Sequence, residues 1–148
     1  MQSSKPPTPL SRKAVVAEAR SWLGVRWLHQ GRNRHGIDCV GLVVVVRRAL
    51  DLDNHDLAGY PREPNGTFLS YFFNAGGIRV PIPQALPGDL LLFRDAVWPC
   101  HVAIVTQRDG DLMHMIHAHT TRRKVLEEPV LHEWKTKWVA AMRMPEID

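Results

Sequence analysis

The sequence contains only two cysteines, Cys39 and Cys100, among its 148 residues. Two cysteines cannot form the several disulfides that hold small secreted domains together. The longest apolar run begins at Val40 and ends before Arg47, which is too short to cross a bilayer, so we expect no membrane insertion. The opening stretch MQSSKPPTPLSRKAVV lacks the apolar core of a secretory signal, and we therefore expect a protein made in the cytoplasm without a signal peptide.

A strong excess of one charge is also missing, because 19 lysines and arginines stand against 15 aspartates and glutamates, a net charge of +4. Such a mild excess favours an acidic partner without identifying one. The basic residues form short clusters without interleaved aromatic residues: Arg32 with Arg34, Arg47 with Arg48, and the run 122–124. Clusters of this kind are typical of solvated surfaces, so we expect no nucleic-acid partner.

The chain length and composition predict one domain. A chain of 148 residues can bury a single sizeable core, and 45% hydrophobic with 23% charged residues is typical of an ordinary globular protein. Residues 1–10 are rich in Ser and Pro and cannot bury enough apolar surface to become ordered. We therefore expect residues 1–10 to form a flexible N-terminal arm and residues 11–148 to form the domain.

The order of predicted elements indicates the α+β class. Residues 11–24 have helical spacing, with Ser11 as N-cap, Gly24 as the stop and an apolar face formed by Val15, Val16, Ala19, Trp22 and Leu23. Residues 25–37 are predicted to form a loop, and residues 51–82 an irregular segment with one short helix. The run 39–50 suits either a strand or a buried helix, and periodicity leaves that choice open. Short strands are predicted at 89–93, 101–106, 112–118, 124–130 and 138–144, so helices precede an antiparallel sheet.

Cys39 lies between an acid and a Val-Gly pair at the head of this apolar run, in the stretch HGIDCVGLVVVV. A thiol is a good nucleophile only as thiolate, which a helix N-terminus or an imidazolium favours. If Asp38 caps a helix, Cys39 occupies its first turn and Gly41 lets another segment approach closely. The alternative is that Cys39 is a small buried hydrophobic residue, as most free cysteines are.

His101 begins the strand HVAIVT and could supply the base that cysteine catalysis requires. After the turn QRDGD, His117 and His119 would point to one face of the next strand and His114 to the other. His117 could therefore orient the His101 ring from a neighbouring antiparallel strand. A zinc site on these histidines is the competing interpretation, but the alternation directs His114 away, so we expect no metal.

The second cysteine and the large tryptophans are expected to have packing roles. Cys100 is predicted to point to the opposite face from His101 and not to pair with Cys39. The tryptophans, among them Trp27 and Trp134, are expected to form the core or the wall of a cleft, because each buries a large area.

Four segments in order, GVRWLHQGRNRHGIDCVGL, PGDLLLF, HVAIV and MIHA, resemble the motifs of the NlpC/p60 family of cell-wall cysteine peptidases. The resemblance covers about residues 11–144. It implies an α+β, papain-like fold in which the cysteine begins a helix packed on an antiparallel sheet, and this favours a helix for residues 39–50. It further implies Cys39 as nucleophile, His101 as general base, His117 as the residue that orients His101, and no cofactor.

The same resemblance implies a substrate and a pocket. The substrate would be the peptidoglycan stem peptide, cut between D-γ-glutamate and the diamino acid. Trp27, Asp38 and Val40 would lie at the oxyanion and substrate pocket. Val40 stands where the family usually has Ser, which removes a hydroxyl but leaves the backbone N–H groups that could hold an oxyanion. Trp27 replaces a common Tyr, so an indole N–H replaces a phenol.

The stretch HQGR, residues 29–32, is similar to a branch of the family encoded in tailed phages and prophages. This similarity implies other tail-tip proteins as partners and a location in the virion tail, from which the enzyme would act on the cell wall. Two alternatives keep the same fold. One is a structural tail-tip subunit with weak or no activity, and the other is an amidase or acyltransferase that uses the same cysteine.

Overall fold

The computed structural model describes residues 10–52, 56 and 67–147 of the chain. Its helices are α1 (Arg12–Arg20), α2 (Cys39–Ala49), α3 (Thr67–Asn74) and α4 (His132–Lys135), with a short 3-10 turn, η1 (Ile82–Gln84). Its strands are β1 (Arg32–Asn33), β2 (Gly36–Ile37), β3 (Ile78–Val80), β4 (Leu90–Arg94), β5 (Pro99–Asp109), β6 (Leu112–His119), β7 (Lys124–Pro129) and β8 (Trp138–Arg143).

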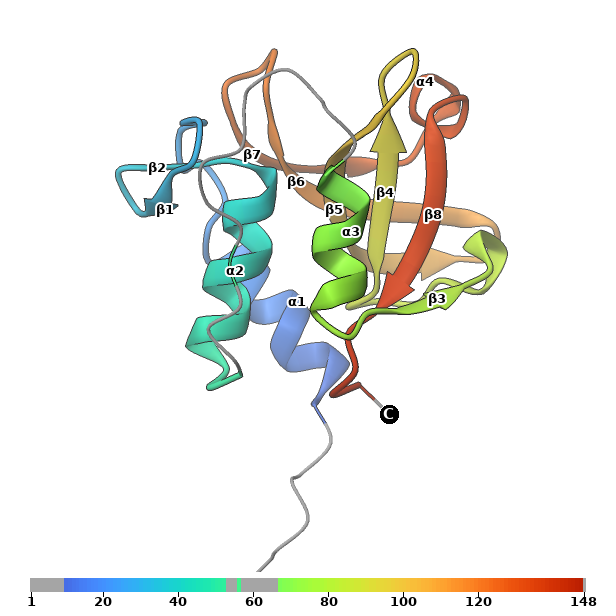
Figure 1. The fold of residues 1–148 in the computed structure, drawn as a ribbon, viewed down its shortest axis with the longest axis horizontal. Helices are drawn as coiled ribbons and strands as arrows, with labels where there is room; N and C mark the ends of the chain where they lie inside the picture. Colours follow the sequence, from blue (N-terminus) through green and yellow to red (C-terminus); the bar gives the residue numbers. More distant parts are fainter. Residues whose placement is uncertain (1–9, 53–55, 57–66, 148) are drawn as a thin grey trace, which may run out of the picture.

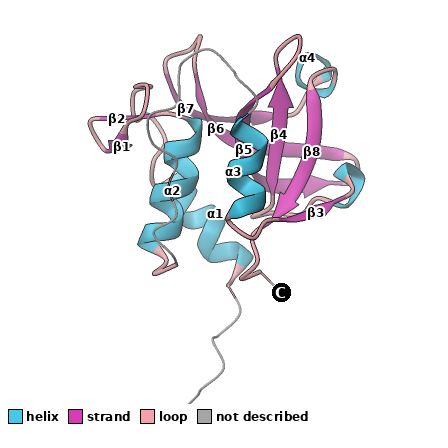
Figure 2. Ribbon diagram, viewed as in Figure 1, coloured by secondary structure: helices cyan, strands magenta, loops and turns pink. Residues whose placement is uncertain are grey.

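Six strands form one antiparallel sheet in the order β3-β8-β4-β5-β6-β7, while β1 and β2 form a separate small hairpin. Helices α1, α2 and α3 lie together on one side of the sheet (Figure 1; Figure 2). Register shifts in β4 and β5 accompany the curvature of the sheet, as bulges do in general. The α+β class and the five strands predicted in the second half are confirmed.

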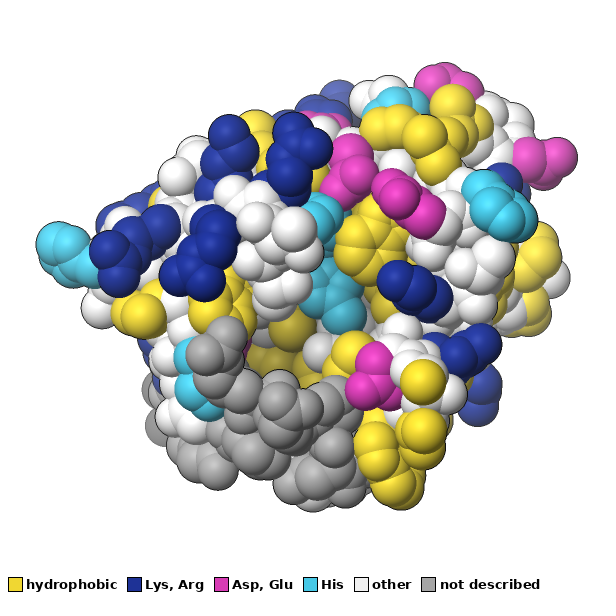
Figure 3. All heavy atoms as spheres, turned by 90° about the horizontal axis from the view of Figure 1, so that it is seen from above, with side chains coloured by type: hydrophobic (Ala, Val, Ile, Leu, Met, Phe, Trp, Pro, Cys, Tyr) yellow, Lys and Arg dark blue, Asp and Glu magenta, His cyan; other side chains and the backbone are white. Residues whose placement is uncertain are grey.

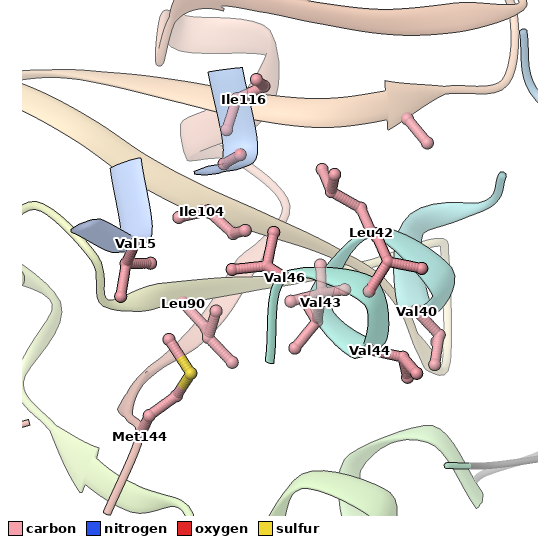
Figure 4. Close-up of a cluster of buried hydrophobic side chains, with 14 of the residues drawn as sticks. Val15, Val40, Leu42, Val43, Val44, Val46, Leu90, Ile104, Ile116 and Met144 are labelled. Atoms are coloured by element: carbon pink, nitrogen blue, oxygen red, sulfur yellow. The ribbon is translucent and has the colours of Figure 1, made fainter. Parts of the chain in front are cut away.

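The hydrophobic residues form two clusters, one on each face of the sheet. The larger cluster fills the space between the helices and the sheet, where α2 contributes Val43 and Val46 and the sheet contributes Leu90 and Ile104 (Figure 4). The smaller cluster lies on the opposite face and includes Phe93, with Trp134 and Trp138 packed against it. In the described part of the chain no helix is long and apolar enough to span a membrane.

Helix α1 begins as predicted and ends earlier than predicted. The Ser11 hydroxyl accepts a hydrogen bond from the Ala14 N–H at 3.3 Å, as an N-cap does. The helix ends at Arg20, and the turn that follows reaches Gly24, whose φ is +86°. Leu23 therefore leaves the helical face and is 45% exposed, so its expected place in the core was wrong.

The ambiguous apolar run forms helix α2. Seven consecutive side-chain positions from Val40 to Val46 are buried, because the helix packs against α1, the sheet and neighbouring segments on nearly all sides. A helix buried on all sides does not show a polar stripe, which is why periodicity alone leaves its type open. The buried Arg47 at its end forms an ion pair with Glu146 at 2.8 Å.

The N-terminal arm lies almost entirely outside the described residues, which begin at Leu10. Leu10 donates its N–H to the carbonyl oxygen of Glu146 at 2.9 Å and pairs with Ile147 in a short bridge. The end of the predicted arm is thus attached to the C-terminal residues. One short helix was predicted within residues 51–82, and α3 is that helix. Most of the residues between 51 and α3 lie outside the described residues.

Gly41 is expected to tolerate no side chain. A Cβ at this position would overlap the carbonyl oxygen of Gly31 and lie 2.8 Å from Ile37 Cγ1. Gly41→Ala should therefore lower the free energy of unfolding by about 3 kcal/mol, the upper range for overpacking, although Ala favours helices by about 1 kcal/mol over Gly. Urea unfolding measures this change, with the exposed Lys13→Ala in α1 as control. A loss below about 1 kcal/mol would contradict the steric argument.

Candidate active site

Cys39 is the first residue of α2, and its side chain is partly exposed. Asp38 caps the helix, because its Oδ1 atom accepts a hydrogen bond from the Gly41 N–H at 2.8 Å. The backbone N–H groups at a helix N-terminus and the helix dipole both favour negative charge nearby. The thiol thus lies where the start of the helix can stabilise a thiolate or an oxyanion.

The Asp38 carboxylate connects the start of α2 to the segment that precedes it. It is buried and accepts two more hydrogen bonds, from the Gln30 N–H at 2.7 Å and from Arg32 Nη1 at 2.9 Å. With Gly41, three donors of the protein thus converge on one carboxylate. The structure places Asp38 beneath the site as a cap and an anchor.

The resting form of Cys39 is the neutral thiol. Burial, and after it the negative charge of Asp38, raises the pKa of this thiol to about 12, although the N–H groups of Val102 and Val40 act in the opposite direction. The sulfur donates a long hydrogen bond, 4.0 Å, to the carbonyl oxygen of Cys100 at the start of β5. Both cysteines are free thiols, as predicted. Cys39 therefore needs a base before it can attack a substrate.

His101 and His117 meet on neighbouring strands, one residue beyond this carbonyl. A tight turn at residues 110–111, within the predicted turn stretch QRDGD, joins β5 to β6 in an antiparallel pair. His101 Nε2 and His117 Nδ1 are 2.7 Å apart, a short hydrogen bond, and the His117 side chain is fully buried. His117 thus holds the ring of His101 in the geometry that was predicted from the strand alternation.

Glu128 forms a hydrogen bond with His117 and so joins the two histidines, a role that the sequence did not predict. Its Oε2 atom is 2.7 Å from Nε2 of His117. The hydrogen bond to His117 is the largest cause that lowers the pKa of the Glu128 carboxyl. Alternation along the stretch KVLEEPV indicates that Glu127 and Glu128 point to opposite faces of the strand, but not which of the two meets His117.

Trp134, from α4, forms the wall behind the histidines. Its ring stacks on His101 with centroids 5.5 Å apart and planes at 25°, and it meets the rings of His117 and His119 edge to face. The indole N–H is buried without a hydrogen bond of ordinary geometry in the described chain, yet it helps to lower the pKa of the Glu128 carboxyl. The predicted role of Trp134 in a wall agrees with this position.

The imidazole of His101 is neutral in the resting molecule. Burial, followed by the charges of His117 and His119, holds its pKa well below the ordinary value for histidine. Within the described residues, Cys39 and His101 each hydrogen bond to another group, and no bond joins the sulfur to the ring. The resting site is therefore a neutral thiol beside a neutral base rather than an ion pair.

The two other pocket residues take different positions. The Val40 side chain is 1% exposed and packs in the larger core cluster, so only its backbone can face the site. Trp27 is partly exposed, pairs with Ile37 through a bridge, and has the Arg123 guanidinium 5.5 Å from its ring centre. Trp27 can therefore present a ring to a bound molecule, whereas Val40 contributes a backbone N–H.

The remaining histidines separate as the strand alternation predicts. His114 lies near Gln107 on the exposed side, whereas the His119 ring is 5.2 Å from the His117 ring. Among the described residues, no three His, Cys, Asp or Glu side chains are arranged to hold a metal ion.

The site opens on the face of the molecule shown in Figure 3. Near the middle of this face, histidine and hydrophobic side chains are exposed in a hollow, and Lys and Arg side chains gather along one side of it. Several basic side chains of the neighbouring segments are exposed, namely Arg26, Arg34, Arg122, Arg123 and Lys124. An acidic molecule would meet a favourable potential at this side.

Comparisons with known proteins identify the family of the chain. The sequence profile described as the NlpC/P60 family matches residues 24–143. Protein P54 of Enterococcus faecium is 33% identical over 93 residues, which are 62% of this chain and 16% of that protein. Probable endopeptidase NlpC of Escherichia coli (strain K12) is 31% identical over 107 residues, 71% of this chain and 60% of that protein. The chain thus spans less than two thirds of each of these relatives.

A solved structure agrees with the sequence comparison. The crystal structure of the NlpC/p60 domain of the peptidoglycan hydrolase SagA superposes with a TM-score of 0.65 and is 25% identical in sequence. The match covers 91% of this chain and 100% of that domain. The papain-like arrangement of helices on an antiparallel sheet is therefore shared.

Proposed function

The chain belongs to the NlpC/P60 family, and we propose that it is a cysteine peptidase that hydrolyses the stem peptides of peptidoglycan. One observation carries the proposal. Cys39 begins a helix beside the start of β5, and the next residues of that strand supply His101, which His117 holds at 2.7 Å. A nucleophile, a base and a group that orients the base are the three parts that nucleophilic catalysis of this kind requires.

The geometry suggests the following steps. His101 takes the proton of the Cys39 thiol while the sulfur attacks the peptide carbonyl, and the N–H groups at the start of α2 stabilise the oxyanion that forms. His101 then gives the proton to the leaving amine, which leaves an acyl group on the sulfur. Water, deprotonated by His101, hydrolyses this thioester and restores the thiol.

The proposal also includes the peptide bond that is cut and the place where the enzyme acts. The family resemblance supports the bond between D-γ-glutamate and the diamino acid. The exposed basic side chains beside the site would attract the carboxylates of an acidic wall polymer. The similarity of residues 29–32 to the phage and prophage branch supports a tail-tip location with other tail proteins as partners.

A structural subunit on the same fold is the second candidate. The observation that favours it is the neutral thiol, whose pKa burial raises to about 12, together with Val40 at the position after the nucleophile. Such a subunit would keep the fold and release no peptides.

Digestion of purified murein separates the two candidates. The wild-type protein and Cys39→Ala are incubated with murein sacculi, and released peptides are identified by mass. We expect new stem fragments with the wild type only, because Ala at position 39 offers no nucleophile, and the fragment masses name the bond. Equal circular dichroism spectra of the two proteins serve as the folding control. An absence of release by both proteins would support the structural subunit.

A further inference from the structure

We propose that Glu128 is a positioning residue that fixes the proton positions of both histidines and leaves Nδ1 of His101 free to accept the proton of Cys39. The inference rests on the proposed peptidase function for its effect on rate. It adds to Cys39, His101 and His117 a fourth side chain, which comes from β7.

The register of β6 and β7 brings Glu128 to His117. Glu128 lies opposite Met115, and the His117 side chain is the diagonal neighbour on the same face of the sheet. The preceding residue, Glu127, lies on the other face and bonds Arg20 of α1 at 2.8 Å. Two neighbouring glutamates thus have different partners, one in the site and one at the helical surface.

When each ring carries one proton, the hydrogen bonds determine which nitrogen holds it. A carboxylate can only accept hydrogen bonds, so in the 2.7 Å contact the proton lies on His117 Nε2. His117 Nδ1 then carries a lone pair and accepts. The 2.7 Å contact with His101 therefore places the proton of His101 on Nε2, and Nδ1 of His101 keeps its lone pair.

Without the Glu128 carboxylate, the proton positions on His117 and His101 would no longer be fixed. His117 could then carry its proton on its own Nδ1 and donate it to His101 Nε2. The proton of His101 would then lie on His101 Nδ1, the nitrogen that the reaction needs unprotonated. The negative charge of Glu128 also favours the imidazolium that forms when His101 takes the thiol proton. Both effects act on the chemical step rather than on substrate binding.

The other charged groups near Glu128 are few. His119 on β6 also lowers the pKa of the Glu128 carboxyl, and Arg122 and Glu133 act on His119. The Glu128 side chain is 26% exposed, so part of it is solvated. Because its strongest partner is His117, protonation of Glu128 at acid pH should reproduce the effect of removing its charge.

The test compares Glu128→Gln and Glu128→Ala with the matched control Glu127→Gln. NMR of protein labelled with 15N in histidine reports which ring nitrogen carries the proton, and murein digestion reports the rate. We expect Nε2–H on both His101 and His117 in the wild type and the control, and mixed proton positions in both Glu128 variants. We expect kcat to fall at least about tenfold in these variants, with KM within about threefold and the control at the wild-type rate.

Two results would overturn the proposal. One is wild-type proton positions and rates in Glu128→Gln and Glu128→Ala, and the other is Nδ1–H on His101 in the wild type. If Glu128→Ala does not fold, Glu128→Gln, which has nearly the same shape, decides alone. If the wild type releases no peptide, the peptidase proposal fails, while the NMR measurement still decides whether Glu128 orders the histidines.

Discussion

Cys39 of the free protein is expected to react with iodoacetamide about a thousandfold faster at pH 10 than at pH 7, because only the thiolate reacts. Burial raises the pKa of this thiol to about 12, so the thiolate fraction increases about tenfold for each pH unit over this range. The measurement uses a Cys100→Ser background, because Cys100 is also a partly exposed free thiol. Mass spectrometry of the alkylated peptide gives the rate at each pH.

A rate that is constant between pH 6 and pH 8 would contradict this expectation, because it would show a thiolate already paired with imidazolium. The His101→Ala variant provides the control. Since no hydrogen bond joins Cys39 to His101 in the described residues, the alkylation rate of the free protein should change little in this variant. The same variant should lose peptide release, so the two assays separate the resting state from the reaction.

A neutral resting pair determines when the proton moves in the proposed reaction. The thiol keeps its proton until a carbonyl is in place, and His101 accepts the proton as the sulfur attacks. Because burial holds the pKa of His101 well below the ordinary value, this base takes up a proton only at a lower pH than an ordinary histidine does. The site would thus avoid an exposed, permanently reactive thiolate, which is easily oxidised.

The sequence predicts the elements that have a strong local signal. The Ser11 cap, the Asp38 cap and the strands at β4 to β8 each follow from short-range patterns, and the structure contains all of them. Helix α2 needed the family resemblance, because its side chains are buried on nearly every side. The pairs β1–β2 and β3–β8 have too few residues for a period-2 pattern to be recognised.

The parts of the site that depend on alternation along strands joined by a tight turn were predictable from the sequence. The parts that depend on the register of strands or on the path of a loop were not. His101 and His117 were placed together because a tight turn joins their strands. Glu128 required the register of β6 against β7, and the stacking of Trp134 required the path of the chain after β7. Asp38 was recognised as a cap, whereas its bonds to the segment before β1 depend on a loop whose path has no periodic signal.

Removal of the Asp38 side chain should both destabilise the protein and acidify the thiol. Asp38→Ala removes the helix cap and leaves the Gln30 N–H and the Arg32 guanidinium without this acceptor, so we expect a loss of about 3 kcal/mol in the free energy of unfolding. Asp38→Asn keeps an oxygen for the Gly41 N–H and should lose about half as much. In both variants the negative charge next to Cys39 disappears, so the pKa of the thiol should fall.

Urea unfolding and the alkylation profile in the Cys100→Ser background measure the two effects separately. Asp95→Ala is the matched control, because Asp95 also accepts hydrogen bonds from two backbone N–H groups, those of Val97 and Trp98, but lies on the surface. It should change stability much less and leave the alkylation of Cys39 unchanged. An Asp38→Asn protein with wild-type alkylation rates at every pH would show that the charge of Asp38 does not reach the sulfur. Burial, the largest cause of the high thiol pKa, would then account for it without Asp38, and His101 would still have to take the proton of Cys39 in the reaction.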